Sequence, residues 1–157
     1  MDRLWAPWRS TYITSRKEKG CIFCTKCRSK DDKKNYIISR GESVFSMLNI
    51  YPYNNGHVMV APYRHVKDLD KLNIDEMTEL MEHSRKIIKM LKKVLKPDAF
   101  NIGINMGRIA GAGFAEHLHI HIVPRWRGDT NFMPIIGKAK IISQSLDELY
   151  KRLKKVE

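Results

Sequence analysis

The segment that most constrains this fold is His117–Pro124, in which three histidines alternate with apolar residues. A two-residue alternation is typical of a β-strand, whose successive side chains point to opposite faces of the sheet. We therefore predict a strand with one face on a core and a row of imidazoles on the other, and imidazole suits proton transfer, metal ligation or nucleophilic attack near neutral pH. The apolar set is Leu118, Ile120 and Ile122, and the imidazole set is His117, His119 and His121.

The rest of the chain predicts further strands and two capped helices. The clearest helix begins at Asn73, with Glu76 in the capping-box position, and ends before Pro97. A second capped helix begins after Ser145 and would pack through Leu146, Leu149, Tyr150 and Leu153. Strands are expected at 36–39, 43–48, 57–62 and 100–106, with the second and third forming a hairpin. We expect an α+β fold, with an antiparallel sheet of about five strands, a long helix and a C-terminal helix.

Several finer expectations accompany this fold. The stripe predicted for the long helix is Ile74, Met77, Leu80, Met81, Ser84, Ile87, Ile88, Leu91 and Leu95, with His83 at the surface or its boundary. Residues 25–35 are polar and lack periodicity, which predicts an exposed loop. The aromatic-rich segment Leu4–Arg9 is expected to pack onto the body or a partner subunit.

Length and composition limit the class of protein. The 157 residues suit a single domain over 1–157, and 43% hydrophobic residues argue against wholesale disorder. We find no apolar run of membrane-spanning length and no secretory signal, so we expect a cytoplasmic protein without membrane partners. The crowding of Cys21, Cys24 and Cys27 then favours metal or redox chemistry over a disulfide framework.

The formal net charge of +12 has two interpretations. It can attract an anion such as nucleic acid or a polyphosphate. Alternatively, it can reflect a solvated, lysine-rich surface. Because the basic residues are spread over 30–34, 85–96 and 151–155, partly on exposed helical faces, we prefer the second interpretation and consider a nucleic-acid partner unlikely.

The glycine-rich stretch before the histidine strand indicates an anion site. Gly111-Ala112-Gly113 lets the backbone approach a ligand closely, and successive N–H groups can form an anion-binding nest. Such a turn is a weak signal alone. Four residues before the histidine strand, it supplies donors for non-bridging oxygens beside a nucleophile, which is what phosphoryl chemistry needs.

Cys21-x2-Cys24 has the spacing of two zinc ligands, and a tetrahedral site needs two more. His65, after a strand end, and His117 are the candidates. The alternative is a pair of buried cysteines that act as small hydrophobic residues, and the spacing alone does not decide between the two. Cys27 extends the series or is a bystander.

The residues from His117 to Val123 match the His-φ-His-φ-His-φ-φ signature (φ apolar) of the histidine triad (HIT) superfamily of nucleotidyl hydrolases and transferases. Residues 55–62 resemble the other diagnostic strand of that family, and Asn105–Gly113 resembles its phosphate loop. The resemblance covers about residues 4–137. Leu4–Arg9, Asn49–Asn54 and Ala115–Trp126 are most similar to the diadenosine tetraphosphate phosphorylase branch.

The resemblance implies a role for each site residue. Among the catalytic residues His57, His117, His119 and His121, His119 would be the nucleophile, and His57 and His121 would flank the phosphate. Asn49 would contact the ribose and Asn105 the phosphate or leaving group, with further substrate contacts from Gly111, Ala112, Gly113 and Phe114. In zinc-bearing members the metal is structural, and its ligands correspond to Cys21, Cys24, His65 and His117. Gly113 stands where the family often has Ser or Thr, so a hydroxyl donor is absent there.

The resemblance also implies a reaction. His119 would attack the α-phosphorus of a nucleotide, with a backbone carbonyl fixing its tautomer, and the nucleotidyl group would pass to an acceptor. We predict phosphorolysis of diadenosine tetraphosphate to ATP and ADP by a homodimer or higher homo-oligomer. Dinucleoside polyphosphate hydrolysis, nucleoside phosphoramidase activity and non-catalytic nucleotide or RNA binding are the alternatives. Arg125 and Arg127 are candidates for holding the acceptor anion or are only solvated, and Trp126 either covers the site or packs.

Overall fold

The computed structural model describes residues 20–129 and 142–157, so Leu4–Arg9 lies outside the described residues. A five-stranded antiparallel sheet has the strand order β1-β2-β3-β5-β4. Its strands are β1 (Ile37–Arg40), β2 (Val44–Leu48), β3 (Val58–Pro62), β4 (Ala99–Ile104) and β5 (Ile120–Arg125). The expected α+β class, the five strands and the hairpin of β2 with β3 are confirmed.

The helices are α2 (Ile22–Arg28), α3 (Asp32–Asn35), the 3-10 turn η1 (Leu69–Lys71), α4 (Ile74–Leu95) and α6 (Leu146–Lys154). The exposed loop predicted for residues 25–35 is wrong, because α2 and α3 occupy most of it. The Cys21 thiol accepts from the Cys24 N–H, and the Asp31 carboxylate accepts from the Lys34 N–H. These side-chain caps bond backbone N–H groups at the helix starts that have no partner within the helix. Both helices are too short for their sequences to show a helical period.

Helix α4 forms the capping box expected at Asn73 and Glu76. Its predicted stripe is partly wrong, because Ile74 and Met81 are 72% and 64% exposed. These two residues are seven apart and lie on one line of the helix, which faces solvent, while the buried line runs through Leu80 and Ile87. His83 is buried rather than at the surface, since its Nε2 lies 3.1 Å from the Ser46 hydroxyl on β2.

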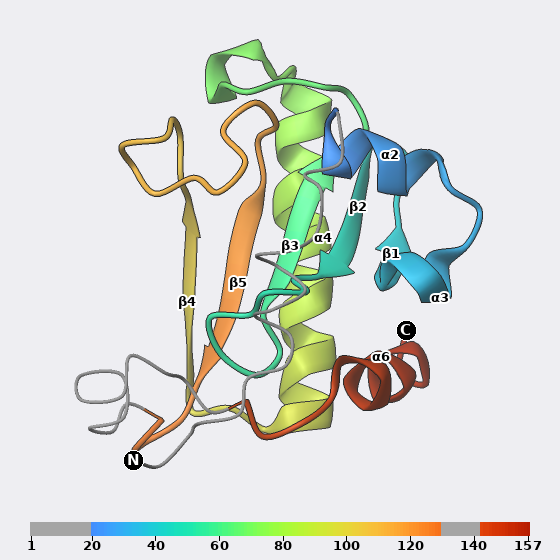
Figure 1. Cartoon of the computed structure of the whole chain (residues 1–157), viewed down its shortest axis with the longest axis vertical. Coiled ribbons are helices and arrows are strands. Elements are labelled where there is room, and N and C mark those ends of the chain that lie inside the picture. The colour runs from blue at the N-terminus through green and yellow to red at the C-terminus, as the bar shows by residue number, and fades with distance from the viewer. Residues whose placement is uncertain (1–19, 130–141) are drawn as a thin grey trace, which may run out of the picture.

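The sheet has two covered faces. Helix α4 runs along one face and α6 packs beside it, whereas α2 lies across the other face near one end (Figure 1). The first face buries aliphatic residues of β1, β2, β3 and β5 together with those of α4 and α6. The second buries a smaller cluster, namely Phe23, Ile37, Phe45, Met47, Met59 and Ala61. None of the described helices has both the length and the apolar character needed to cross a bilayer.

Candidate active site and metal site

The histidine row lies where β5 begins. Leu118, Ile120 and Ile122 belong to the aliphatic core under α4, and the three histidines face the other side, so the predicted alternation is confirmed. The regular strand starts only at Ile120, and the extended segment before it is held by a 2.6 Å hydrogen bond from the Leu118 N–H to the Val66 carbonyl. All three imidazoles are at most 8% exposed.

Hydrogen bonds fix the tautomers of His57 and His121. The backbone N–H of Tyr53 can only donate, and it lies 3.1 Å from His57 Nδ1, which must therefore accept. A neutral His57 then carries its proton on Nε2 and donates to His121 Nδ1 over 2.8 Å. His121 in turn carries its proton on Nε2, which is buried and has no partner among the described residues. A buried donor without a partner is costly, so this N–H is placed to bind a ligand acceptor.

His119 has the opposite tautomer. Its Nδ1 lies 2.8 Å from the His117 carbonyl oxygen, which can only accept, so Nδ1 carries the proton. The expectation that a backbone carbonyl fixes this ring is confirmed. The lone pair is therefore on Nε2, the atom a nucleophile needs.

Burial keeps these imidazoles neutral. Desolvation, followed by the proximity of His121 and His119, lowers the pKa of His57 to about 3. Desolvation and His119 lower the pKa of His121 to about 4. Burial also lowers the pKa of His119, against the opposing effect of its carbonyl partner. At pH 7 the site thus combines an unprotonated Nε2 on His119 with a neutral N–H donor on His121.

A second cluster joins α2 to the histidine segment. Cys21, Cys24, His65 and His117 place one donor atom each within 4.8 Å of one another. Cys21 Sγ and His117 Nδ1 are 3.2 Å apart, and Cys24 Sγ and His65 Nδ1 are 3.4 Å apart. Bonds of 2.0–2.3 Å in a tetrahedral zinc site separate its ligands by about 3.3–3.8 Å, so this donor set fits a metal such as zinc.

Two further observations support that fit. The His117 Nε2–H donates to the Pro62 carbonyl over 2.9 Å, which leaves Nδ1 unprotonated and pointing at the thiols. Burial raises the pKa of Cys21 to about 11, so a thiolate there requires a nearby cation. Cys27 is not one of the four, because its thiol donates instead to the Cys24 carbonyl over 3.4 Å.

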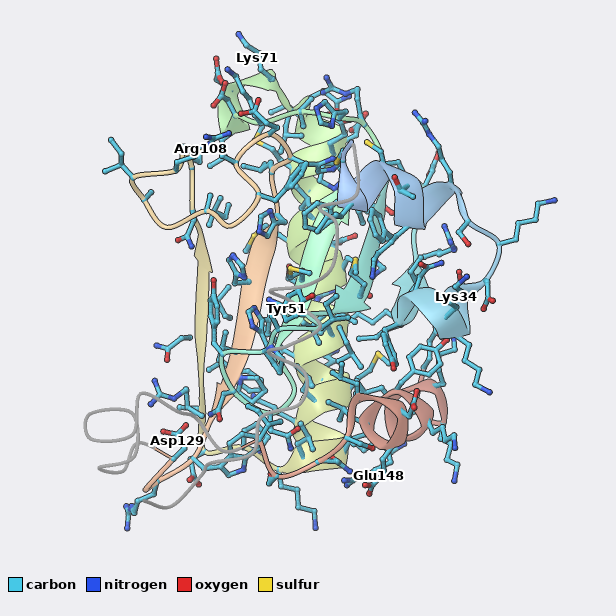
Figure 2. All side chains as sticks on the ribbon, viewed as in Figure 1. Lys34, Tyr51, Lys71, Arg108, Asp129 and Glu148 are labelled. Atoms are coloured by element: carbon cyan, nitrogen blue, oxygen red, sulfur yellow. The ribbon has the colours of Figure 1, made fainter. Side chains whose placement is uncertain are left out.

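The predicted substrate residues form two groups, one beside His57 and one in the loop between β4 and β5. Asn49 holds its side-chain nitrogen 3.3 Å from His57 Nδ1, and its oxygen accepts from the Tyr51 N–H. The loop between β4 and β5 carries Arg108, as labelled in Figure 2, and at Gly111 it takes a left-handed φ of +89°. A Cβ at Gly111 would lie 3.8 Å from the Asn105 side-chain nitrogen, so this part of the loop lies beside Asn105. Ala112 is buried and Gly113 is exposed.

Other candidates have structural surroundings. Phe114 is half-buried and packs edge-on against Phe23, at 6.1 Å between ring centroids. Arg125 pairs with Asp129 and also donates to the Asn101 side chain. Because a strand rises about 3.3 Å per residue, Trp126 lies about 16 Å along the chain from His121. At that separation Trp126 does not cover the histidines of its own chain, which favours a packing role. Trp126 lines a cavity of about 360 Å³ with residues of α4 and α6, and the Arg127 side chain is exposed.

Sequence reasoning missed two aromatic residues of the site. The Tyr53 ring stacks on His121, with centroids 5.6 Å apart and a 28° interplanar angle, and is 49% exposed. The Phe23 ring lies 4.7 Å from that of His119. Phe23 lies between Cys21 and Cys24, the two cysteines with zinc-ligand spacing, and this position is the sequence signal that could have identified it as a site residue.

Comparisons with known proteins agree with this geometry. The HIT domain family matches residues 30–128. An AP-4-A phosphorylase from Mycobacterium tuberculosis is 42% identical over 154 residues, which cover 93% of this chain and 79% of the relative. A bis(5'-nucleosyl)-tetraphosphatase (asymmetrical) from Schizosaccharomyces pombe is 39% identical over 101 residues, which cover 64% of this chain and 55% of the relative.

Solved structures share the fold. A hypothetical histidine triad nucleotide-binding protein from Sulfolobus tokodaii matches with a TM-score of 0.67 and 29% identity, over 87% of this chain and 88% of its own. A zinc-bound histidine triad family protein from Mycobacterium smegmatis matches with a TM-score of 0.68 and 24% identity, over 87% and 91% of the two chains. At that identity the second likeness shows the fold alone.

Proposed function

This chain belongs to the HIT domain family, and from that premise we propose that it transfers a nucleotidyl group from a dinucleoside polyphosphate through His119. The observation that carries the proposal is the pair of opposite tautomers. His119 offers a lone pair on Nε2, while His121 offers a buried N–H without a partner. A nucleophile beside a donor for phosphoryl oxygen is the arrangement that this transfer requires.

The first step forms a bond between His119 Nε2 and the α-phosphorus as the bond to the leaving polyphosphate oxygen breaks. The His117 carbonyl, which accepts from Nδ1, stabilises the positive charge that develops on the ring. The His121 Nε2–H donates to a phosphate oxygen, and His57 holds it in that tautomer. In the second step an oxygen of the acceptor attacks phosphorus, and the bond to His119 breaks.

We propose inorganic phosphate as the acceptor, so that diadenosine tetraphosphate yields ATP and ADP. The support is the 42% identity to an AP-4-A phosphorylase over most of both chains. The site also buries its histidines, and a phosphorylase must exclude competing water.

Product analysis with and without phosphate tests the acceptor. We expect phosphate to stimulate turnover, and labelled phosphate to appear as the β-phosphate of ADP. AMP formed at the same rate without phosphate would make the protein a hydrolase. Binding of nucleotide or RNA without any turnover would instead support a non-catalytic regulator.

We also propose that the Cys21, Cys24, His65 and His117 cluster binds a structural zinc ion, because four protein donors leave no position for substrate. When bound, the ion would connect α2 to the histidine segment through its metal–ligand bonds. The three free cysteines, none of them in a disulfide, are consistent with a reducing compartment such as the cytoplasm.

A homodimer is the third part of the proposal, with each chain forming one domain of this family. Strand β4 lies at the edge of the sheet and exposes Ile102 by 51%, followed by Met106 at 47%. An open apolar edge favours pairing with another strand, and a second copy offers a matching one. Light scattering should give twice the chain mass, and Ile102→Lys should shift that mass toward the monomer.

A further inference from the structure

Phe23 packs directly against the candidate nucleophile. Its side chain is 1% exposed, and its ring centroid lies 4.7 Å from that of His119, with 33° between the planes. The same ring lies 5.0 Å from that of His117, with a tilt of 32°. One phenyl ring therefore covers a face of both imidazoles.

The ring is held firmly from its other sides. Phe45 on β2 and Phe114 meet it edge-on at 6.5 and 6.1 Å between centroids. Arg40 anchors the far end of α2, donating to the carbonyls of Cys27 and Ser29 over 2.8 and 2.9 Å. A ring wedged in this way cannot turn or retreat without disturbing the packed cluster around it.

His119 needs such support because its hydrogen bonding is sparse. Among the described residues, its Nδ1 bonds to the His117 carbonyl, which holds one point of the ring but leaves the plane free to rotate about that point. His121 meets it edge-on, at 4.6 Å and 70°. A flat aromatic surface against its face removes the remaining rotation, and so aims Nε2 in a fixed direction.

We propose that Phe23 is a positioning residue that fixes the plane of the His119 imidazole for attack on the α-phosphorus. The inference rests on the proposed role of His119 as nucleophile. It gives the Cys21–Cys24 segment two roles, since Cys21 and Cys24, which bracket Ile22 and Phe23, also supply thiols to the cluster with His65 and His117. The segment that closes this cluster thereby also orders the nucleophile.

The test compares Phe23→Leu with the matched control Phe45→Leu in the full-length chain. Both residues are buried phenylalanines of one cluster, but the ring contacts of Phe45 are with Phe23 and Tyr63 rather than with a histidine. For each variant we would measure the single-turnover rate of nucleotidyl-enzyme formation, the dissociation constant of diadenosine tetraphosphate, bound zinc and Tm.

We expect the two variants to lose similar thermal stability. Phe23→Leu should slow nucleotidyl-enzyme formation by about tenfold or more, because small misplacements of a reacting group are costly. Substrate affinity should stay within about twofold in both variants, and Phe45→Leu should slow nucleotidyl-enzyme formation clearly less than Phe23→Leu, because it removes only one of the contacts that hold the Phe23 ring.

Three results would overturn the inference. They are equal rates in the two variants, a loss confined to substrate affinity, or a loss in Phe23→Leu that tracks missing zinc and is restored by adding it. If Phe23→Leu shows no cooperative unfolding, Phe23→Met replaces it under the same criteria, because methionine fills irregular gaps without a flat ring. An unmodified protein that forms no nucleotidyl-enzyme would contradict the nucleophile assignment itself, which separates the two failures.

Discussion

The two faces of the sheet are built from the same strands but by different interactions. On the α4 side, β5 buries Leu118, Ile120 and Ile122 among aliphatic residues. On the α2 side, the alternate residues of the same segment are imidazoles that contact thiols, aromatic rings and each other. The first face is stabilised by the burial of apolar surface, which has no preferred direction, whereas the second depends on oriented hydrogen bonds.

The difference assigns separate roles to the two faces. Aliphatic burial stabilises the fold without specifying chemistry. Burying an imidazole is costly unless its polar atoms are paired, and here backbone groups, other histidines and the cysteines of the candidate metal site supply partners for most of these atoms, the exception being His121 Nε2. One buried histidine, His83, lies on the aliphatic side instead. There the Ser46 hydroxyl is its hydrogen-bond partner.

The largest expected effect contrasts these two buried histidines. His119→Ala should lower turnover by several orders of magnitude, about 10⁴-fold or more, because it removes the proposed nucleophile. His83→Ala should leave turnover within about twofold and reduce stability, since it removes a packed group that contacts no substrate. Steady-state kinetics and thermal unfolding of both variants make the measurement, and near-normal turnover in His119→Ala would refute the assignment.

Metal removal should have the second-largest effect. The purified protein should hold about one zinc per chain, and chelation should lower Tm by about 10 °C or more, because the ion ties α2 to the histidine segment. Cys24→Ser should lose the metal. Cys27→Ser should retain it, because Cys27 lies outside the four-residue cluster. Elemental analysis that finds no metal in protein prepared without chelator would exclude the zinc proposal.

A cavity on the aliphatic face should affect stability alone. Ile87 is 1% exposed on α4, and Ile87→Ala should lower the free energy of unfolding by about 2–5 kcal/mol. Turnover below the unfolding transition should change by less than about twofold. Denaturant titration and kinetics on one preparation test this, and a large fall in kcat would mean that the two faces are coupled.

The smallest expected effect is the pH dependence of stability contributed by the imidazole face. The pKa values of His57 and His121 are lowered to about 3 and about 4, so the unfolded chain binds protons first as the pH falls. Their contribution is therefore complete above about pH 6.5 and is lost progressively on acidification towards pH 4. Denaturant titration at pH 7 and pH 5 measures the loss, and His57→Gln with intact folding should reduce it.

Patterns local in the chain could be interpreted without the structure. The alternation in His117–Val123 and the capping box of Asn73 and Glu76 depend on residues within one strand or one helical turn, so spacing alone predicts them. The short helices α2 and α3 escaped prediction because seven and four residues are too few for a period to appear. Burial of His83 escaped it because its hydroxyl partner is 37 residues away.

The site itself was only partly determined by the sequence, which located its histidines and, through a family resemblance, predicted their roles. The opposite tautomers of His119 and His121 depend on the backbone groups of His117 and Tyr53. The packing of Phe23 on His119 joins residues 96 positions apart. Only the tertiary structure decides such features, because hydrogen-bond direction and ring contact depend on how distant segments meet in space, and residue order does not encode that in any local pattern.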